Sequence, residues 1–384
     1  MVQVGHPARS RPTVATVDLA ALESNVALLG RIVAPAKTMI VVKADGYGHG
    51  AFPVATAAMR AGAVAVAVAL VDEAAELREQ AFDGPILVLS EPPPEALLTA
   101  CRLGVACTLY TVGGIEAARQ ASRAASRAMS VHLKIDTGMH RVGADLADAV
   151  ELARVIDQAA ELDLVGTFTH LAVADHPSDP FTGLQLDRFE EVCAAIRGAG
   201  IDPGLLHAAN SAGAIAHRRA RLDLVRIGIA AYGELPSPLL APILAEQLDT
   251  EVLRPVLSLR SSVHVVRRLA AGERTSYGQL YRLDRDSTVV TVPIGYADGV
   301  PRSLAAGGGE VLIGGRRRAI AGTVSMDQLI VDVGDDVVRS GDEVVLIGAQ
   351  GDEEITASEW AERTGTIAYE ILSRLGTRIP RRIA

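Results

Sequence analysis

The segment Val41-Val42-Lys43-Ala44-Asp45-Gly46-Tyr47-Gly48-His49-Gly50 places a lysine at the end of an apolar run, with several glycines directly after it. The chain has only three lysines, Lys37, Lys43 and Lys134, among its 37 lysine and arginine residues. A primary amine can form an imine with an aldehyde, whereas the arginine guanidinium stays charged and cannot replace it. Lys43 is therefore the first candidate for a chemical role.

The apolar run that ends at Lys43 is the first of eight such runs, which alternate with segments of helical periodicity between residues 18 and 233. This alternation is typical of parallel strands joined by crossover helices, and eight strands can close a barrel. The predicted strands are 39–43, 64–70, 85–89, 106–110, 130–136, 165–170, 205–210 and 222–227. Predicted helices include 71–80, 144–160 and 187–198, with a leading helix at 19–33. We therefore expect an α/β fold built on a (β/α)8 TIM-type barrel.

The pattern of alternating strands and helices stops after residue 233. Prolines punctuate a connector, and short β-rich runs follow at 256–266, 287–293, 310–313 and 328–333. A length of 384 residues also suits two domains. We expect the barrel to occupy residues 13–240, and a mainly β C-terminal domain to occupy residues 241–384 together with residues 1–12.

Charge and composition exclude several classes of function. A net charge of −9 argues against nucleic-acid binding, and we predict that the one tight basic cluster, Arg316-Arg317-Arg318, is a solvated turn. Cys101, Cys107 and Cys193 have neither disulfide-framework nor zinc-site spacing, so we expect a reducing cytoplasm and no metal. The longest apolar run, 61–71, is too short to span a bilayer, and the chain begins with no signal-like segment.

Reactive residues gather at the predicted carboxyl ends of the strands, where (β/α)8 barrels carry their active sites. These residues are Lys43, Lys134, Asp136, Arg141, His170, His207, Asn210, Ser211 and Arg226. The loops after strands seven and eight commonly form a phosphate site in this fold, and Ser211 and the Gly228 turn lie there. A lysine that can form an imine, opposite a phosphate-binding site, is what pyridoxal 5'-phosphate (PLP) requires.

Eight ordered motifs resemble those of the alanine racemases, which are PLP enzymes built from a barrel and a β domain. The motifs are the Lys43 segment, Lys134-Ile135-Asp136-Thr137-Gly138-Met139-His140-Arg141, His207-Ala208-Ala209-Asn210-Ser211, Arg226-Ile227-Gly228, Ser276-Tyr277-Gly278, Gly295-Tyr296-Ala297-Asp298-Gly299, Ser325-Met326-Asp327 and Thr366-Ile367-Ala368-Tyr369-Glu370. The resemblance extends over nearly the whole chain. It implies a homodimer with shared active sites that makes D-alanine for peptidoglycan.

The resemblance also assigns the catalytic groups. Lys43 carries PLP covalently and then acts as the base on one face of the substrate, while Tyr277 of the partner subunit acts on the other face. His170 and Arg226 form a hydrogen-bond chain that favours the tyrosinate. Arg226 meets the pyridine nitrogen and disfavours its protonation, which should limit side reactions.

Further positions match the family's binding residues. Cofactor binding is implied for Tyr47, Ser211, Gly228, Ile229 and Tyr369, besides Lys43 and Arg226. Substrate binding is implied for Arg141, Met326 and Tyr296, the last as an entrance gate, whereas Asp327 could equally be a surface carboxylate. Lys134 matches a position that is carbamylated in many relatives, and the resulting anion would hold Arg141 in place.

Three alternatives remain beside alanine racemisation. A PLP-dependent amino-acid decarboxylase shares the layout, but that class is expected to pair the pyridine nitrogen with a carboxylate rather than with Arg226. A non-catalytic PLP carrier is a single barrel and would lack the second domain. A racemase with broader specificity that accepts serine is also compatible, because a few methylene groups discriminate by only about 1–3 kcal/mol.

Overall fold

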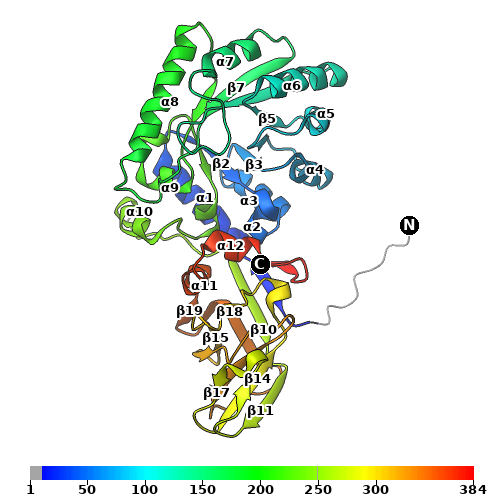
Figure 1. The fold of residues 1–384 in the computed structure, drawn as a ribbon, viewed down its shortest axis with the longest axis vertical. Helices are drawn as coiled ribbons and strands as arrows, with labels where there is room; N and C mark the ends of the chain where they lie inside the picture. Colours follow the sequence, from blue (N-terminus) through cyan, green and yellow to red (C-terminus); the bar gives the residue numbers. More distant parts are fainter. Residues whose placement is uncertain (1–10, 249) are drawn as a thin grey trace, which may run out of the picture. The chain divides into compact units, whose positions relative to one another are not determined.

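The computed structural model describes residues 11–248 and 250–384, which form two compact units (Figure 1). One unit is Ala20–Arg254, and the other combines residues 11–19 with Pro255–Ala384. The breaks lie some residues beyond positions 13 and 240, where the sequence suggested them. Strand β1 (Val14–Val17) pairs with β10 and β20 of the second unit, and helix α10 (Ala241–Gln247) packs on α9 of the first.

The first unit is the predicted barrel. Its eight strands follow the order β8-β7-β6-β5-β4-β3-β2-β9, and every ladder is parallel. They are β2 (Lys37–Val41), β3 (Ala65–Val68), β4 (Ile86–Val88), β5 (Ala106–Leu109), β6 (Met129–Lys134), β7 (Leu162–Phe168), β8 (Leu205–His207) and β9 (Leu224–Ile227). Backbone hydrogen bonds from Asp223 to Leu206 (3.1 Å) and from Arg226 to Ala209 (3.0 Å) join the two end strands. The expectation of a (β/α)8 barrel is confirmed.

Helices follow the strands around the outside of this barrel (Figure 1). They are α1 (Leu19–Val33), α2 (Lys43–Gly48), α3 (Ala51–Arg60), α4 (Val71–Glu79), α5 (Pro94–Leu103), α6 (Val112–Ala125), α7 (Ala149–Asp157), α8 (Phe181–Gly198), α9 (Ser211–Ala216) and α10, with the short turns η1 (Arg218–Ala220), η2 (Ile229–Tyr232) and η3 (Pro238–Leu240). Helix α7 begins later than predicted because Ala144 forms a β-bridge with Ile135. Helix α8 begins earlier because the Asp179 carboxylate accepts the N–H of Phe181 (2.8 Å).

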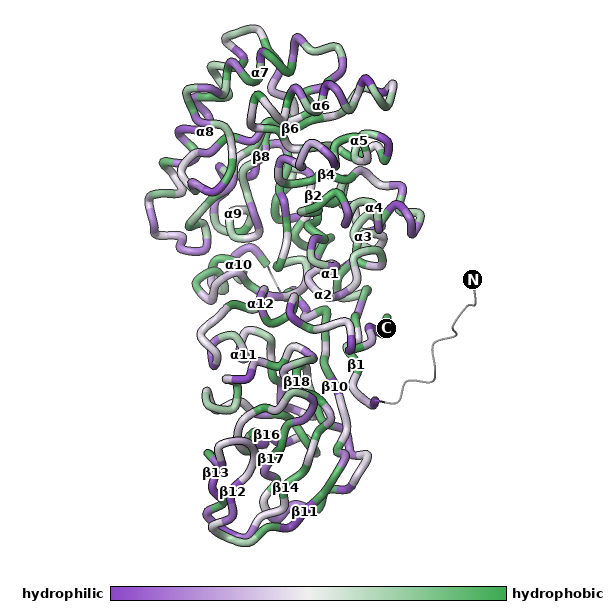
Figure 2. Tube along the Cα trace, turned by 45° about the vertical axis from the view of Figure 1, so that its right-hand side comes forward, coloured by the Kyte–Doolittle hydropathy of each residue, from purple (hydrophilic) through white to green (hydrophobic). Residues whose placement is uncertain are grey.

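The barrel interior combines apolar packing with a polar centre. Hydrophobic residues, green in Figure 2, follow the strands, and most strand side chains are fully buried. Four groups that can carry charge, His132, Lys134, His207 and Arg226, are nevertheless at most 5% exposed. Buried charge is costly unless it is paired or hydrogen-bonded, so these residues mark the part of the barrel that is built for chemistry.

The second unit is mainly β, as predicted. One sheet has the order β16-β15-β18-β10-β1-β20, with β19 added on β18, a second has the order β11-β14-β17, and β12 pairs with β13. The elements are β10 (Leu257–Ser262), β11 (Val265–Leu269), β12 (Arg274–Thr275), η4 (Tyr277–Gln279), β13 (Tyr281–Arg282), β14 (Ser287–Val292), η5 (Tyr296–Asp298), β15 (Glu310–Ile313), β16 (Arg316–Ala319), β17 (Leu329–Gly334), β18 (Glu343–Gln350), β19 (Glu353–Ile355), α11 (Ala357–Thr364), α12 (Ala368–Ser373) and β20 (Arg381–Ile383).

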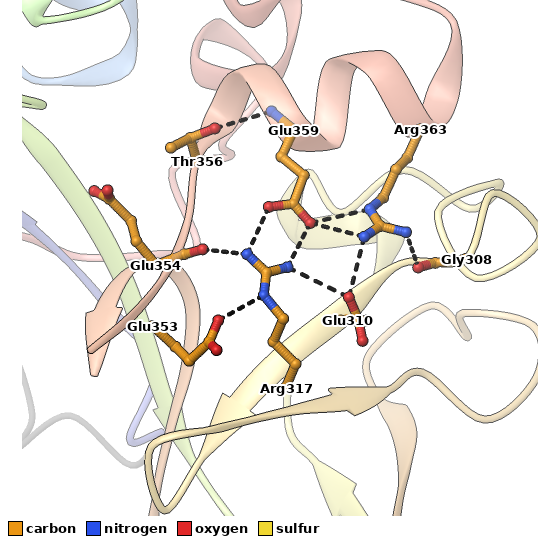
Figure 3. Close-up of polar contacts among 8 residues, drawn as sticks. All are labelled: Gly308, Glu310, Arg317, Glu353, Glu354, Thr356, Glu359 and Arg363. Carbon is orange, nitrogen blue, oxygen red and sulfur yellow. Dashed lines mark hydrogen bonds and ion pairs between the residues drawn. The ribbon is translucent and has the colours of Figure 1, made fainter. Parts of the chain in front are cut away.

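The arginine cluster at 316–318 is not the solvated turn that its charge suggested. It opens strand β16, which pairs with β15, and Arg317 contacts Glu359 (2.8 Å) and Glu353 (2.8 Å). Arg363 of α11 shares Glu359 and Glu310 with it, so the ion pairs join the three strands β15, β16 and β19 to a helix (Figure 3). Opposite charges on adjacent elements outweighed the mutual repulsion of the three arginines.

Two further expectations concern the cysteines and membrane-spanning segments. The three cysteines are buried and carry free thiols. Within residues 11–248 and 250–384, no helix combines the length and apolar character needed to cross a membrane.

Candidate active site

Lys43 follows strand β2 and begins an unusual turn. Residues Ala44 to Tyr47 all adopt left-handed backbone angles, with φ between 51° and 62°. Such angles are unfavourable for residues other than glycine, so surrounding contacts must hold them. The Glu73 carboxylate accepts the N–H of Ala44 (2.6 Å), and the Asp45 carboxylate accepts that of Ala51 (2.8 Å). The turn fixes Lys43 at the strand end, as the sequence predicted.

The environment of Lys43 lowers the pKa of its amine. Burial lowers the pKa of Lys43, the nearby Arg141 lowers it further, and Glu73 acts in the opposite direction. An amine must be neutral to attack a carbonyl or to accept a proton. The lowered pKa of Lys43 raises the fraction of neutral amine, which is the form that a nucleophile or base requires.

Hydroxyl and N–H groups converge at Gly228, beside the end of β9. Ser211 Oγ accepts the N–H of Gly228 (2.9 Å) and lies 3.4 Å from the N of Ala230. A Cβ atom on Gly228 would lie only 2.7 Å from the Tyr47 hydroxyl. Because hydroxyl and backbone N–H donors are the groups that bind phosphate, this cluster fits a phosphorylated cofactor. Ile229, which is fully buried, begins the turn η2.

Arg226 is a buried cation surrounded by neutral acceptors. Its Nη2 donates to the carbonyls of Thr169 (2.7 Å) and Ala208 (3.0 Å), and its Nη1 lies 2.8 Å from His207 Nδ1. His170 Nδ1 lies 3.3 Å from Nη2, so His170 and Arg226 are within hydrogen-bonding distance, as expected. Burial lowers the pKa of Arg226 to about 9. Burial and the neighbouring Arg226 also hold the pKa of His170 well below its usual value, so His170 is neutral.

Lys134 lies beside the same groups at the end of β6. Burial lowers its pKa to about 8, and the positive charges of Arg226, Arg141 and Lys43 contribute, against the opposing effect of Asp136. The ammonium also lies 5.4 Å from the centre of the Phe168 ring. An amine that is partly neutral near pH 8 can react with carbon dioxide, which fits the expectation for this residue.

Tyr277, Tyr296 and Met326 lie in the second unit, where the first two are hydrogen-bonded to the segment that directly precedes Met326. The Thr323 hydroxyl donates to the Tyr277 carbonyl (3.0 Å), and the N–H of Tyr296 donates to the carbonyl of Ser325 (3.0 Å). The three side chains are 70%, 40% and 52% exposed, respectively. Large apolar or aromatic side chains exposed on one segment and its bonded neighbours are typical of a surface that another molecule covers.

Asp327 and Tyr369 belong to the second unit as well. Asp327 is exposed and pairs with Arg378 (2.6 Å), which accords with the surface alternative for this carboxylate. Tyr369 is half-buried on α12. The expected site residues thus form one group in the barrel and another in the second unit.

The sequence comparisons cover both units. Residues 17–236 match the family model "Alanine racemase, N-terminal domain", and residues 256–383 match "Alanine racemase, C-terminal domain". The chain belongs to the alanine racemase family.

Individual alanine racemases match over nearly their full length. The enzyme of Symbiobacterium thermophilum is 46% identical over 376 residues, which cover 97% of each chain. The crystal structure of alanine racemase from D-cycloserine-producing Streptomyces lavendulae has a TM-score of 0.91 at 37% identity, and covers 97% of each chain. That of the Bacillus anthracis alanine racemase with bound L-Ala-P has a TM-score of 0.90 at 37% identity, covering 97% of this chain and 95% of that one.

Several groups at this alanine racemase site were not singled out from the sequence. Glu73 holds the Lys43 turn, Phe168 stacks on His207 (4.6 Å between ring centres), and His132 Nδ1 lies 2.9 Å from His207 Nε2. In the second unit the buried Asp298 accepts two hydrogen bonds from Arg11. Only the alternation of His132 with Lys134 along β6 offered a sequence signal, because both positions face the barrel interior.

Proposed function

We propose that this chain interconverts L-alanine and D-alanine and so supplies D-alanine for peptidoglycan. The observation that carries the proposal is the placement of a pKa-lowered lysine, Lys43, on the same barrel as the Tyr47–Ser211–Gly228 cluster, in a member of the alanine racemase family. Racemisation requires that one proton leaves Cα and another returns to the opposite face. Two acid/base groups must therefore flank the substrate.

We infer that the cofactor is PLP, which when bound acidifies the Cα proton of an attached amino acid. Lys43 would hold its aldehyde carbon covalently. Tyr47, Ser211, Gly228 and Ile229, with Tyr369, would hold its phosphate. The close approach of the Tyr47 hydroxyl to Gly228 supports this assignment, since a side chain at position 228 would displace that hydroxyl.

Arg226 would face the pyridine nitrogen of that cofactor. A guanidinium has only N–H donors, so it can donate to the nitrogen but cannot accept a proton from it. The neutral acceptors around Arg226 leave its positive charge without a carboxylate partner among the described residues. Arg226 therefore disfavours a proton on the ring nitrogen and restrains reactions other than racemisation.

The two bases are Lys43 and the partner subunit's Tyr277. A neutral tyrosine is a weak base, and positive charge relayed from Arg226 through His170 would favour its ionised form. The exposure of Tyr277, Met326 and Tyr296 supports a homodimer, because a second copy could cover these side chains and receive them in its site. Arg141 and Met326 would bind the substrate carboxylate, with Tyr296 at the entrance, while Asp327 is retained as a weaker candidate.

The test is chiral analysis of L-alanine incubated with the purified protein and PLP. We expect D-alanine from the wild type and from the control Lys37→Ala, which removes an exposed lysine at the opposite end of β2. Lys43→Ala should form none although it remains folded. A wild-type protein that binds PLP yet forms no D-alanine would refute the proposed reaction, and serine and carbon dioxide release would then be measured.

A further inference from the structure

A hydrogen-bonded histidine pair extends from Arg226 through the barrel. His207 Nδ1 lies 2.8 Å from Arg226 Nη1, and His207 Nε2 lies 2.9 Å from His132 Nδ1. His207 is fully buried, and His132 is 5% exposed. The racemase roles described above account for Arg226 and His170 but assign no task to this pair.

The chemistry of arginine permits only one arrangement of protons along this chain. Arg226 can only donate, so His207 Nδ1 must present a lone pair. Burial, with the Arg226 charge as the second cause, holds the pKa of His207 well below its usual value and lowers that of His132 to about 4. Both rings are therefore neutral, and the single proton of His207 must be on Nε2. It is donated to His132 Nδ1.

The neighbouring residues are shaped to keep the two rings in contact. His132 on β6 lies opposite Gly166 on β7, and a Cβ atom on Gly166 would lie 2.3 Å from His132 Nδ1. Phe168 stacks on His207 with 4.6 Å between ring centres and lies edge-on to His132. The Arg226 guanidinium carbon lies 5.0 Å from the centre of the same ring. Any side chain at position 166 would displace the acceptor nitrogen of His132.

His132, the residue of this hydrogen-bonded series farthest from Arg226, lines a cavity of about 370 Å³. His132 lines this cavity together with Lys37 and Ser130, which lie at or near the beginnings of β2 and β6. Lys134, by contrast, lies at the carboxyl end of β6. The histidine pair thus connects the guanidinium with the opposite end of the barrel, where His132 Nε2–H has room to donate to water.

We propose that His132 is a positioning residue for the racemase site. By accepting the Nε2–H of His207 it fixes the tautomer of His207, which in turn presents the Nδ1 lone pair that orients the Arg226 guanidinium. This role rests on the proposed function only in so far as Arg226 faces the cofactor. Without an acceptor at position 132, His207 can place its proton on Nδ1, and two N–H groups then oppose each other at Arg226.

The first test reads the tautomers by 15N NMR of the histidine rings in protein freed of cofactor. We expect wild-type His207 to be neutral with its proton on Nε2, and a His207 protonated on Nδ1 would overturn the proposal without any variant. His132→Leu and Gly166→Ala should populate the Nδ1–H form of His207. His132→Asn should retain the wild-type form, because its amide oxygen can lie close to the position of Nδ1.

The second test is the kinetics of alanine racemisation by the PLP-loaded variants. His132→Leu should lower kcat by about tenfold or more, the effect expected from leaving one buried donor unpaired, with little change in KM. His132→Asn should recover most of kcat. The matched control is His217→Leu, whose half-buried ring does not belong to the hydrogen-bonded series Arg226–His207–His132, and its kcat should match that of the wild type. A folded His132→Leu protein with unchanged tautomers and kcat would refute the role. If the wild type racemised nothing, the NMR result would still decide the tautomer lock.

Discussion

A Cβ atom on Gly228 would lie 2.7 Å from the hydroxyl oxygen of Tyr47, although the two residues are far apart in the sequence. Ser211 Oγ accepts the N–H of the same glycine at 2.9 Å. The turn after the last barrel strand and the turn after the first strand therefore meet at a point where an added side chain would displace the Tyr47 hydroxyl. A single methyl group at position 228 should therefore disturb the proposed phosphate-binding site.

We expect Gly228→Ala to weaken PLP binding by about tenfold or more, since forcing a methyl group into a packed site costs about 1–3 kcal/mol. The dissociation constant can be measured by absorbance titration of the cofactor-free protein. Gly30→Ala is the matched control, because a Cβ at Gly30 meets no atom within 4 Å and alanine suits the interior of helix α1. Equal affinity of Gly228→Ala and wild type would contradict the assigned phosphate site.

We expect Lys134 to be carbamylated in the presence of carbon dioxide. Burial and the surrounding cations lower its pKa to about 8, so the neutral, reactive amine becomes the major form as the pH rises above this value. Carbamylation would replace a repelled cation by an anion beside Arg141 and Arg226. In 13C NMR with labelled bicarbonate, the wild type should show a carbamate signal that grows with rising pH and is absent from Lys134→Ala. If no carbamate signal depended on Lys134 at any pH, carbamylation of this residue would be refuted.

We expect Asp298→Asn to destabilise the second unit by about 3 kcal/mol at neutral pH, the cost of removing one partner from a buried ion pair. Burial alone would raise the pKa of Asp298, but hydrogen bonds from Arg11 and the Gly295 N–H, with the charge of Arg378, hold it below its ordinary value. The stabilisation is therefore complete above the unfolded-state pKa of about 4 and is lost as the pH falls through the folded-state pKa.

Thermal unfolding measured from pH 7 to pH 3 checks this sign, because the gap between wild type and Asp298→Asn should narrow in acid. Asp335→Asn is the control, since it removes an exposed, solvent-screened partner of Arg268 and should change the stability little at any pH. A gap that stays constant with pH would show that the Asp298 charge contributes nothing. The Asp298 carboxylate accepts the N–H of Gly295 (3.0 Å), the residue directly before Tyr296. Because Asp298→Asn would alter this bond and so the position of Tyr296 at the proposed entrance, KM for alanine should rise in the same variant.

We expect mixtures of inactive Lys43→Ala and Tyr277→Phe proteins to regain activity. If each site combines Lys43 of one subunit with the partner subunit's Tyr277, a hybrid dimer has one site with both residues intact and one with neither. Activity should approach about a quarter of the wild-type value after random exchange, since half of the dimers are hybrids with one of two sites intact. No recovery after exchange is proven by mass spectrometry would rule out shared sites.

Periodicity predicted the elements whose structure depends on local pattern. The leading helix at 19–33, the strand at 310–313 and the position of Lys43 behind the first barrel strand follow from alternating or helical apolar spacing. The resemblance named residues that the barrel then gathers around Arg226. The assignment of roles to these residues stays a prediction until the experiments above are done.

Features that depend on distant partners were not predictable from pattern alone. The left-handed turn at Ala44–Tyr47 is unfavourable locally and is held by Glu73 and Asp45. The arginines at 316–318 resemble a solvated turn until their glutamate partners on other elements are known. His132 reads as an ordinary core histidine, and only its contact with His207 distinguishes it.

The central claim is that two different groups remove and return the Cα proton, and isotope exchange tests it most directly. L-alanine should be converted to a few per cent in D2O by the PLP-loaded wild type, and both enantiomers analysed by chiral chromatography and mass spectrometry. Two-base transfer predicts that the D-alanine formed carries solvent deuterium at Cα. D-alanine that retained the hydrogen of the L-alanine substrate would mean that a single base serves both faces, which would contradict the pairing of Lys43 with Tyr277.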